Sequence, residues 1–320
     1  MSATQKGESV MSKERSFHKE GRLLIKSLGE AITLFRKNDP LRMAGATAFF
    51  TTFALPPIVF ILARLFGLFI DRRLIGRGLL ERISNTLGKD GAEQVRQVIK
   101  SIHGFSNNGY VTVFGFIFLL FVATTLFTII RNSVDQIWQI GVKERPGLLF
   151  SLTSRIRSFT VIMLIGILFF ADLLFDSLSA MARNYFNEIL KDDGFYFKTA
   201  LNEIVGAIIV SVWFILLFRF LADGKPSGKV SLIGGFITGA LFTAGRLLLR
   251  FLLIDSNIGR LYGSSASLVL VLLFVFYSSF ILYYGACFIL VYSEHKKWPI
   301  RISKNAFYYK IEKMQRRELP

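Results

Sequence analysis

The chain has 320 residues, of which 52% are hydrophobic and 14% aromatic, and it carries a formal net charge of +17. With a mean hydropathy of +0.48 it is too apolar for a soluble protein. Its single cysteine, Cys287, and three scattered histidines form no recognisable zinc or iron constellation. We therefore expect no intrachain disulfide, no metal and no cofactor.

The apolar residues come in six blocks of about 20, the length needed to cross ~30 Å of hydrocarbon. They predict an all-α, polytopic membrane protein, in which a bundle of six transmembrane helices is accompanied by amphipathic interfacial helices. A cytoplasmic tail (1–38), the transmembrane domain (39–294) and a basic cytoplasmic tail (295–320) would follow one another. The predicted spans are residues 43–70, 110–130, 158–176, 200–222, 230–254 and 266–292.

The segment before the first span is polar and basic. No signal-peptide core precedes that span, so we expect it to act as the insertion signal, and we expect residues 1–16 to be disordered. Within residues 17–37, apolar side chains such as Leu24 and Leu28 recur at helical spacing and predict an amphipathic helix. This helix either lies on anionic phospholipid of the inner leaflet or is a cytosolic helix packed on the next loop.

Two prolines, Pro56 and Pro57, lie at the middle of the first span. A proline removes a backbone donor and clashes with the preceding turn, so the helix must kink or break there. In transporters, broken helices often line the path of the substrate. The alternative interpretation is a kink that neighbouring helices satisfy.

Amphipathic patterns also occur outside the spans. Apolar residues at helical spacing within residues 71–108, and again after the third span, predict two helices that cover the outer face. In the C-terminal tail, Phe307, Ile311 and Met314 predict a second helix on the inner leaflet.

The fifth span contains a G-x-x-x-G pattern formed by Gly235 and Gly239. Small residues at this spacing let two helices approach closely. Packing within the bundle is the first interpretation, and a homo-oligomer interface is the weaker alternative.

Basic residues are unevenly distributed between the segments that join the spans. The two terminal segments, together with the connections between spans two and three and between spans four and five, contain 24 of the 39 Lys and Arg, whereas the other connections contain 11. Because basic residues favour the cytoplasmic side, both termini should lie in the cytoplasm. The chain has no Asn-x-Ser/Thr acceptor, which fits a bacterial inner (plasma) membrane.

Charged residues inside the spans cost free energy in hydrocarbon, so their positions indicate where a partner, a cavity or the membrane interface lies. With the N-terminus inside, Arg219 lies near the inner end of the fourth span and can snorkel to the cytoplasm. The remaining three cations and three anions fall at a similar depth in the outer half. They are Arg64, Asp172, Asp176, Glu203, Arg246 and Arg250.

Two interpretations of this cluster remain open. In one, the charges form structural ion pairs, or snorkel to a nearby water boundary. In the other, they line a polar vestibule that opens outward, where the arginines bind an anionic group such as a phosphate or carboxylate. The ligand-binding residues would be Arg246, Arg250 and Arg64, with Asp172, Asp176 and Glu203 as counter-ions.

Several short motifs occur in order along the chain. They are MAGATAFF at 43–50, LPP at 55–57, ATTLF at 123–127, Trp138 after the second span, and LYGS at 261–264. Their order and spacing resemble the YihY/BrkB family over residues 39–294.

The resemblance implies a six-helix inner-membrane protein. Members of that family have been labelled virulence factors and once ribonuclease BN, and some are suspected of moving lipids or lipid-linked envelope precursors. Cys287 stands where the family usually has an acidic residue, which argues against an essential carboxylate there.

These observations favour a transporter or flippase-like protein for a lipid or another anionic envelope amphiphile. The alternative is a non-catalytic structural or scaffolding membrane protein. We do not expect an enzyme: the histidines lie in three separate segments, and no cytoplasmic segment has carboxylates at metal-ligand spacing, so the sequence does not support ribonuclease activity. Topology and anionic lipid explain the basic tails, so no nucleic-acid partner is expected.

Overall fold

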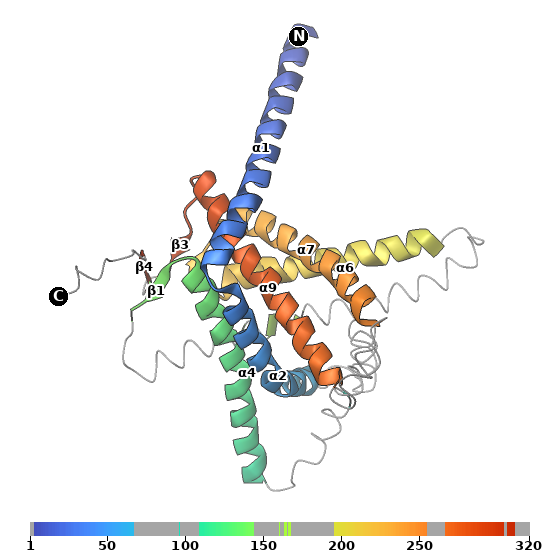
Figure 1. Cartoon of the computed structure of the whole chain (residues 1–320), viewed down its shortest axis with the longest axis vertical. Helices are drawn as coiled ribbons and strands as arrows, with labels where there is room; N and C mark the ends of the chain where they lie inside the picture. Colours follow the sequence, from blue (N-terminus) through green and yellow to red (C-terminus); the bar gives the residue numbers. More distant parts are fainter. Residues whose placement is uncertain are drawn as a thin grey trace, which may run out of the picture.

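The computed structural model describes residues 3–66, 96, 109–143, 160, 163–164, 166–167, 195–254, 266–303 and 306–310. Within these residues the protein is mostly helical (Figure 1). The third predicted span and the outer amphipathic segments lie largely or entirely outside the described residues.

A few very short strands accompany the described helices. Two helical stretches, Gly228–Leu249 and Leu268–His295, are long and apolar enough to cross a membrane, and Ile204–Phe220 is a shorter apolar helix. The helices are α1 (Ala3–Lys37), α2 (Pro40–Phe66), α4 (Gly109–Ile137), α6 (Phe195–Phe220), α7 (Gly228–Ile254) and α9 (Ala266–His295). The strands are β1 (Ile140–Val142), β2 (Gly224–Lys225), β3 (Arg301–Ile302) and β4 (Ala306–Tyr308).

The helix α9 lies at the centre of the described helices (Figure 1). It packs against α1, α2 and α7, and over a shorter stretch against α4. An almost uninterrupted apolar sequence suits this place, because neighbours cover α9 on several sides. Tyr283, Cys287 and Phe288 in its second half are fully buried.

The C-terminal half of α1 packs on α9, which shows what its apolar stripe contacts. Ser27 and Ala31 are completely buried there, and the ring of Phe35 meets that of Phe280 edge-on at a centroid distance of 4.6 Å. The predicted amphipathic helix is therefore present. The expectation of disorder in residues 1–16 is wrong, because α1 already begins at Ala3 and that segment is rich in residues that favour helices.

The helix α2 continues through both of its prolines. It runs from Pro40 to Phe66 as one element, so Pro56 and Pro57 do not interrupt it. Its last turns, in lighter blue, run in a different direction from its first part (Figure 1). A bent helix satisfies the constraint that proline imposes, since only the donors and contacts of the turn around it are lost.

Among the described helices, α6 and α7 form the most extensive pair. At Gly235 a Cβ atom would collide with Ile215 of α6, and at Gly239 it would collide with the backbone and hydroxyl of Ser211. Close approach of the two backbones therefore requires glycine at both places. Within this chain, the G-x-x-x-G face packs against α6.

The C-terminal tail returns to the end of the helices as two short strands. β4 pairs antiparallel with β1, and β2 pairs antiparallel with β3. The prediction of a helix starting near Phe307 is therefore wrong over 306–308. Over three residues an alternating and a helical pattern cannot be distinguished, and pairing with β1 decides the conformation.

Candidate functional site

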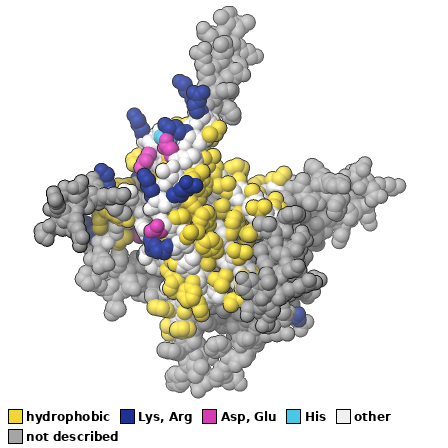
Figure 2. Space-filling model, viewed as in Figure 1, with side chains coloured by type: hydrophobic (Ala, Val, Ile, Leu, Met, Phe, Trp, Pro, Cys, Tyr) yellow, Lys and Arg dark blue, Asp and Glu magenta, His cyan; other side chains and the backbone are white. Residues whose placement is uncertain are grey.

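Charged side chains gather at one end of the described helices. In Figure 2 they lie over the C-terminal half of α1 and the end of α9, whereas the surface beyond them is largely hydrophobic. The α1 side chains include Glu20, Lys26 and Glu30, and those of α9 and its end include His295 and Lys296. This charged end, where α1, α4, α9 and the four strands meet, is the candidate functional site.

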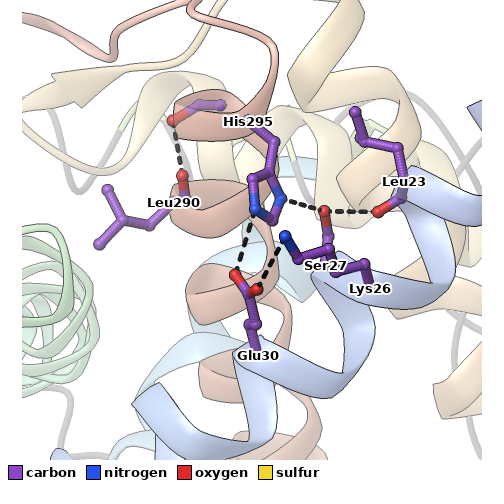
Figure 3. A network of polar contacts seen from close by, with 7 residues as sticks. Leu23, Lys26, Ser27, Glu30, Leu290 and His295 are labelled. Carbon is purple, nitrogen blue, oxygen red and sulfur yellow. Dashed lines mark hydrogen bonds and ion pairs between the residues drawn. The ribbon is translucent and has the colours of Figure 1, made fainter.

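A three-residue contact joins α1 to α9 at this end (Figure 3). The Nδ1 atom of His295 lies 2.9 Å from the hydroxyl of Ser27, and its Nε2 atom lies 3.2 Å from a carboxylate oxygen of Glu30. The Ser27 hydroxyl also donates to the carbonyl oxygen of Leu23 over 2.8 Å. Since that hydroxyl has one proton, it must accept the hydrogen bond from Nδ1.

The order Ser27, His295, Glu30 matches the residue types of a hydrolytic triad, but the serine is not poised as a nucleophile. Ser27 is completely buried, and its proton is directed to Leu23 instead of the imidazole. A nucleophilic serine must be reachable by substrate and must give its proton to the histidine. The contact therefore has a structural role: it holds α1 against α9.

A second pair of charged side chains lies at the same junction. Lys296 donates to Glu20 over 2.8 Å, and its ammonium lies 5.9 Å from the ring centroids of Tyr292 and Trp298. The hydrogen bond to Lys296 lowers the pKa of the Glu20 carboxyl, and the same bond raises the pKa of Lys296. Because Glu20 is exposed, this pair adds little stability by itself.

On the other side of the site, a buried carboxylate fixes the turn between α6 and α7. One oxygen of Asp135 accepts the backbone N–H groups of Asp223 and Gly224, at 2.9 and 3.3 Å. The guanidinium of Arg131, one turn earlier on α4, lies 3.8 Å from the carboxylate of Asp223. Burial, and then the nearby charge of Asp223, raise the pKa of Asp135 to about 7.

The indole of Trp138 joins the end of α4 to α9 next to this turn. Its N–H donates to the carbonyl oxygen of Ala286 over 2.9 Å, so the end of α4 is attached to α9. A Cβ atom at Gly224 would collide with the side chains of Trp138, Ile140 and Ile300. The turn can approach this closely only because position 224 is glycine.

A cavity of about 640 Å³ opens at the charged end, between α1, the end of α4, α9 and β4. Its wall combines two lysines, two glutamates, three aromatic residues, three aliphatic side chains, a threonine and a glutamine. The residues are Glu30, Thr33, Leu34, Lys37, Trp138, Gln139, Leu290, Val291, Glu294, Tyr308, Tyr309 and Lys310.

The residues predicted from the sequence as a charge cluster lie elsewhere. Arg246 is half-buried on α7, and Arg250 lies one turn further along the same helix. Arg64 and Glu203 belong to α2 and α6, while Asp172 and Asp176 lie outside the described residues. The ion pairs made by Lys26, Arg131, His295 and Lys296 lie at the charged end. The proposed pairing within the predicted cluster stays a prediction.

Arg219 lies where the sequence placed it, at the end of α6. Its guanidinium donates to the carbonyl oxygen of Pro226 over 3.1 Å in the turn before α7. In contrast, the sequence predicted neither the cavity nor the contact of His295 with Ser27 and Glu30. Ser27 and His295 are 268 residues apart, and only the packing of α1 on α9 brings them together.

Comparison with known proteins adds independent information. A family profile described as virulence factor BrkB matches residues 31–306. The UPF0761 membrane protein of Teredinibacter turnerae is 25% identical over 283 residues, which are 88% of this chain but only 63% of that protein. The UPF0761 membrane protein of Aliivibrio salmonicida is 23% identical over 268 residues, 82% of each chain. That of Haemophilus influenzae is 22% identical over 255 residues, covering 79% of this chain and 89% of the relative. No solved structure matches the chain.

Proposed function

The chain belongs to the virulence factor BrkB family of membrane proteins, and from this membership we propose that it moves a lipid or another anionic envelope amphiphile across the bacterial inner membrane. The proposal comprises six spans, with both termini in the cytoplasm. It includes no catalytic chemistry and no nucleic-acid ligand.

The exposed faces of the described helices support a place in the bilayer. Large apolar side chains point outward on helices that also have buried faces, which would be unfavourable in water and is normal in lipid. They include Phe49, Phe50 and Phe53 on α2, Ile117, Phe118 and Phe121 on α4, and Leu232, Phe236, Leu247 and Leu248 on α7.

The charged end supports the orientation. It combines residues from the segment before the first span with residues from the connection after α4, the turn between α6 and α7, and the tail. These are the segments that contain most of the Lys and Arg, and such segments favour the cytoplasm.

One observation carries the proposed activity: a polar cavity lined by two lysines and two glutamates lies directly beside the apolar body of the helices. The charged headgroup of an amphiphile can lie in the cavity while its apolar chains lie against the neighbouring apolar surface. The arginines of α7, Arg246 and Arg250, would attract the anionic part of the substrate further along the helices.

The experiment is lipid translocation in proteoliposomes. Purified protein, reconstituted with fluorescently labelled phosphatidylglycerol, should speed the access of that lipid to an impermeant quencher relative to empty liposomes. The double variant Arg246→Ala/Arg250→Ala should reduce the rate. The matched double variant Lys225→Ala/Arg301→Ala, which removes two exposed cations outside the cavity, should leave the rate unchanged.

Translocation no faster than in empty liposomes would refute the lipid version of this proposal and leave a scaffolding role. A rate that falls equally in both double variants would show that net charge matters and that the α7 arginines do not. Robust metal-dependent RNA cleavage by highly purified protein would contradict the absence of catalytic chemistry.

A further inference from the structure

The cavity at the charged end lies at the level where the predicted spans begin and end. Lys37 on its wall comes shortly before the first span, Trp138 shortly after the second, and Val291 at the end of the sixth. If these helices cross the bilayer as proposed, the cavity is at the depth of lipid headgroups. The inference rests on that part of the proposed function and not on transport.

The formal charges on the cavity wall are balanced. Lys37 and Lys310 supply two cations, and Glu30 and Glu294 supply two anions. A purely anionic ligand would bring its charge towards two carboxylates, and a purely cationic ligand would face two ammonium groups. A ligand with one charge of each sign avoids both penalties.

The two glutamates are not equivalent. Glu30 is engaged by His295 at 3.2 Å and by Lys26 at 3.7 Å. The carboxylate of Glu294 has no ion pair or side-chain hydrogen bond with the described part of the chain. Among the described residues, Glu294 is thus the wall carboxylate without such a contact, and we assign the cationic group of a ligand to it.

The remaining lining suits a compact polar headgroup attached to a chain. Tyr308 and Tyr309 offer aromatic faces, the hydroxyl of Tyr308 donates to the carbonyl oxygen of Ile300, and Leu290 and Val291 border the apolar body. A volume of about 640 Å³ is in the range of small-molecule sites. It leaves room for a phosphodiester and an amine within one site.

We propose that this cavity binds a phosphodiester that bears a primary ammonium, as in the headgroup of phosphatidylethanolamine. The phosphodiester lies toward Lys37 and Lys310, and the ammonium lies at Glu294. A primary ammonium donates hydrogen bonds to a carboxylate, whereas the quaternary ammonium of choline has no N–H to donate. The site therefore discriminates between two zwitterions of equal charge.

The test uses the full chain in detergent and binding measured by native mass spectrometry. The probes are short-chain phosphatidylethanolamine, phosphatidylcholine and phosphatidylglycerol, together with free phosphoethanolamine. Phosphatidylethanolamine should bind about tenfold more tightly than phosphatidylcholine, the discrimination expected from one charge-assisted hydrogen bond. It should also bind more tightly than phosphatidylglycerol.

Three variants separate the parts of the site. Glu294→Gln should bring the affinities for phosphatidylethanolamine and phosphatidylcholine together, because it removes the charge that the ammonium meets. Lys37→Gln should weaken both zwitterionic lipids in equal proportion, since both have the same phosphodiester. Lys225→Gln, at an exposed position outside the cavity, should change neither. Helical content and a single gel-filtration peak verify that each variant is folded.

Equal affinity of the wild-type protein for phosphatidylethanolamine and phosphatidylcholine would overturn the proposal, as would tighter binding of phosphatidylglycerol. A preference that survives Glu294→Gln would overturn the assignment of the ammonium to Glu294. Free phosphoethanolamine binding as tightly as the lipid would support the headgroup chemistry and assign it to a soluble ester. Translocation that fails while this binding persists would refute the proposed function alone.

Discussion

The indole N–H of Trp138 donates to the carbonyl oxygen of Ala286 over 2.9 Å and joins the end of α4 to α9. Trp138 is only 2% exposed, and it also borders the cavity and the turn at Gly224. One side chain thus holds together a helix end, the central helix and the wall of the candidate site.

Replacing this indole should destabilise the protein in two distinguishable steps. Trp138→Phe keeps most of the ring volume but loses the hydrogen bond, so it should cost about 1 kcal/mol. Trp138→Ala also leaves a cavity and should cost about 3–5 kcal/mol. Thermal unfolding in detergent, followed by circular dichroism, measures both. Equal losses in the two variants would show that the hydrogen bond, and not the packing, dominates.

Asp135 should make stability depend on pH. Its pKa rises to about 7 in the folded protein, above the ordinary value of 3.8, so the folded state binds the proton more tightly than the unfolded state does. Its contribution is therefore fully present below about pH 4 and is lost as the pH rises through about 7. Asp135→Asn keeps an oxygen for the two backbone N–H groups and should flatten the change of unfolding midpoint between pH 4 and pH 8.

A companion variant tests the geometry around Asp135. Asp135→Ala leaves the N–H groups of Asp223 and Gly224 without their acceptor and should cost about 2 kcal/mol or more at pH 7. If Asp135→Asn destabilises as much as Asp135→Ala does, then the charge and not the acceptor position matters at this turn.

Two glycines allow a matched test of the α6–α7 contact. At Gly239 an added Cβ collides with the backbone of Ser211, so Gly239→Ala should separate the helices and cost about 1–3 kcal/mol. At Gly206 on α6 an added Cβ meets no atom within 4 Å. Gly206→Ala should therefore be neutral, or stabilising by up to about 1 kcal/mol. Thermal unfolding of both variants is the measurement, and equal shifts would contradict the packing described here.

The contact between His295, Ser27 and Glu30 should hold α1 in place. His295→Ala removes both hydrogen-bonded contacts, so the backbone amides of α1 near Ser27 should exchange with deuterium about tenfold faster. The buried second half of α9 should stay protected. The control is Arg22→Ala, an exposed position on α1. Unchanged exchange in the histidine variant would mean that apolar packing alone fixes α1.

Cysteine labelling tests the orientation. In a Cys287→Ala background, single cysteines at Lys143, Lys225 and Arg301 occupy exposed positions at the charged end. All three should react with an impermeant maleimide only after the membrane of spheroplasts has been permeabilised, because the proposed orientation places this end in the cytoplasm. Reaction of the three positions in intact spheroplasts would reverse the orientation, and a mixed result would contradict the arrangement of the spans.

Long apolar stretches made the helical part of the fold predictable. The predicted fifth and sixth spans coincide closely with α7 and α9, since length and hydropathy alone define such helices. The stripe that includes Leu24 and Leu28 also correctly predicted a helix, because periodicity reports on which face is buried.

The charged end was not predictable, because it depends on contacts between distant segments. Asp135 is 88 residues from the amide of Asp223 that it accepts, and His295 is 268 residues from Ser27. Neither pair leaves a local pattern. The short strand at 306–308 was mistaken for a helix for the same reason, since its partner β1 lies far earlier in the chain.

The pairing of β4 with β1 also sets an order of events during synthesis. Ile140 leaves the ribosome long before its partner Tyr308, so the strand after α4 waits until all the described helices have been translated. Tyr308, Tyr309 and Lys310 form part of the cavity wall. The cavity is thus completed last. A nascent chain whose membrane helices are all inserted still lacks part of the cavity wall until β4 has paired with β1.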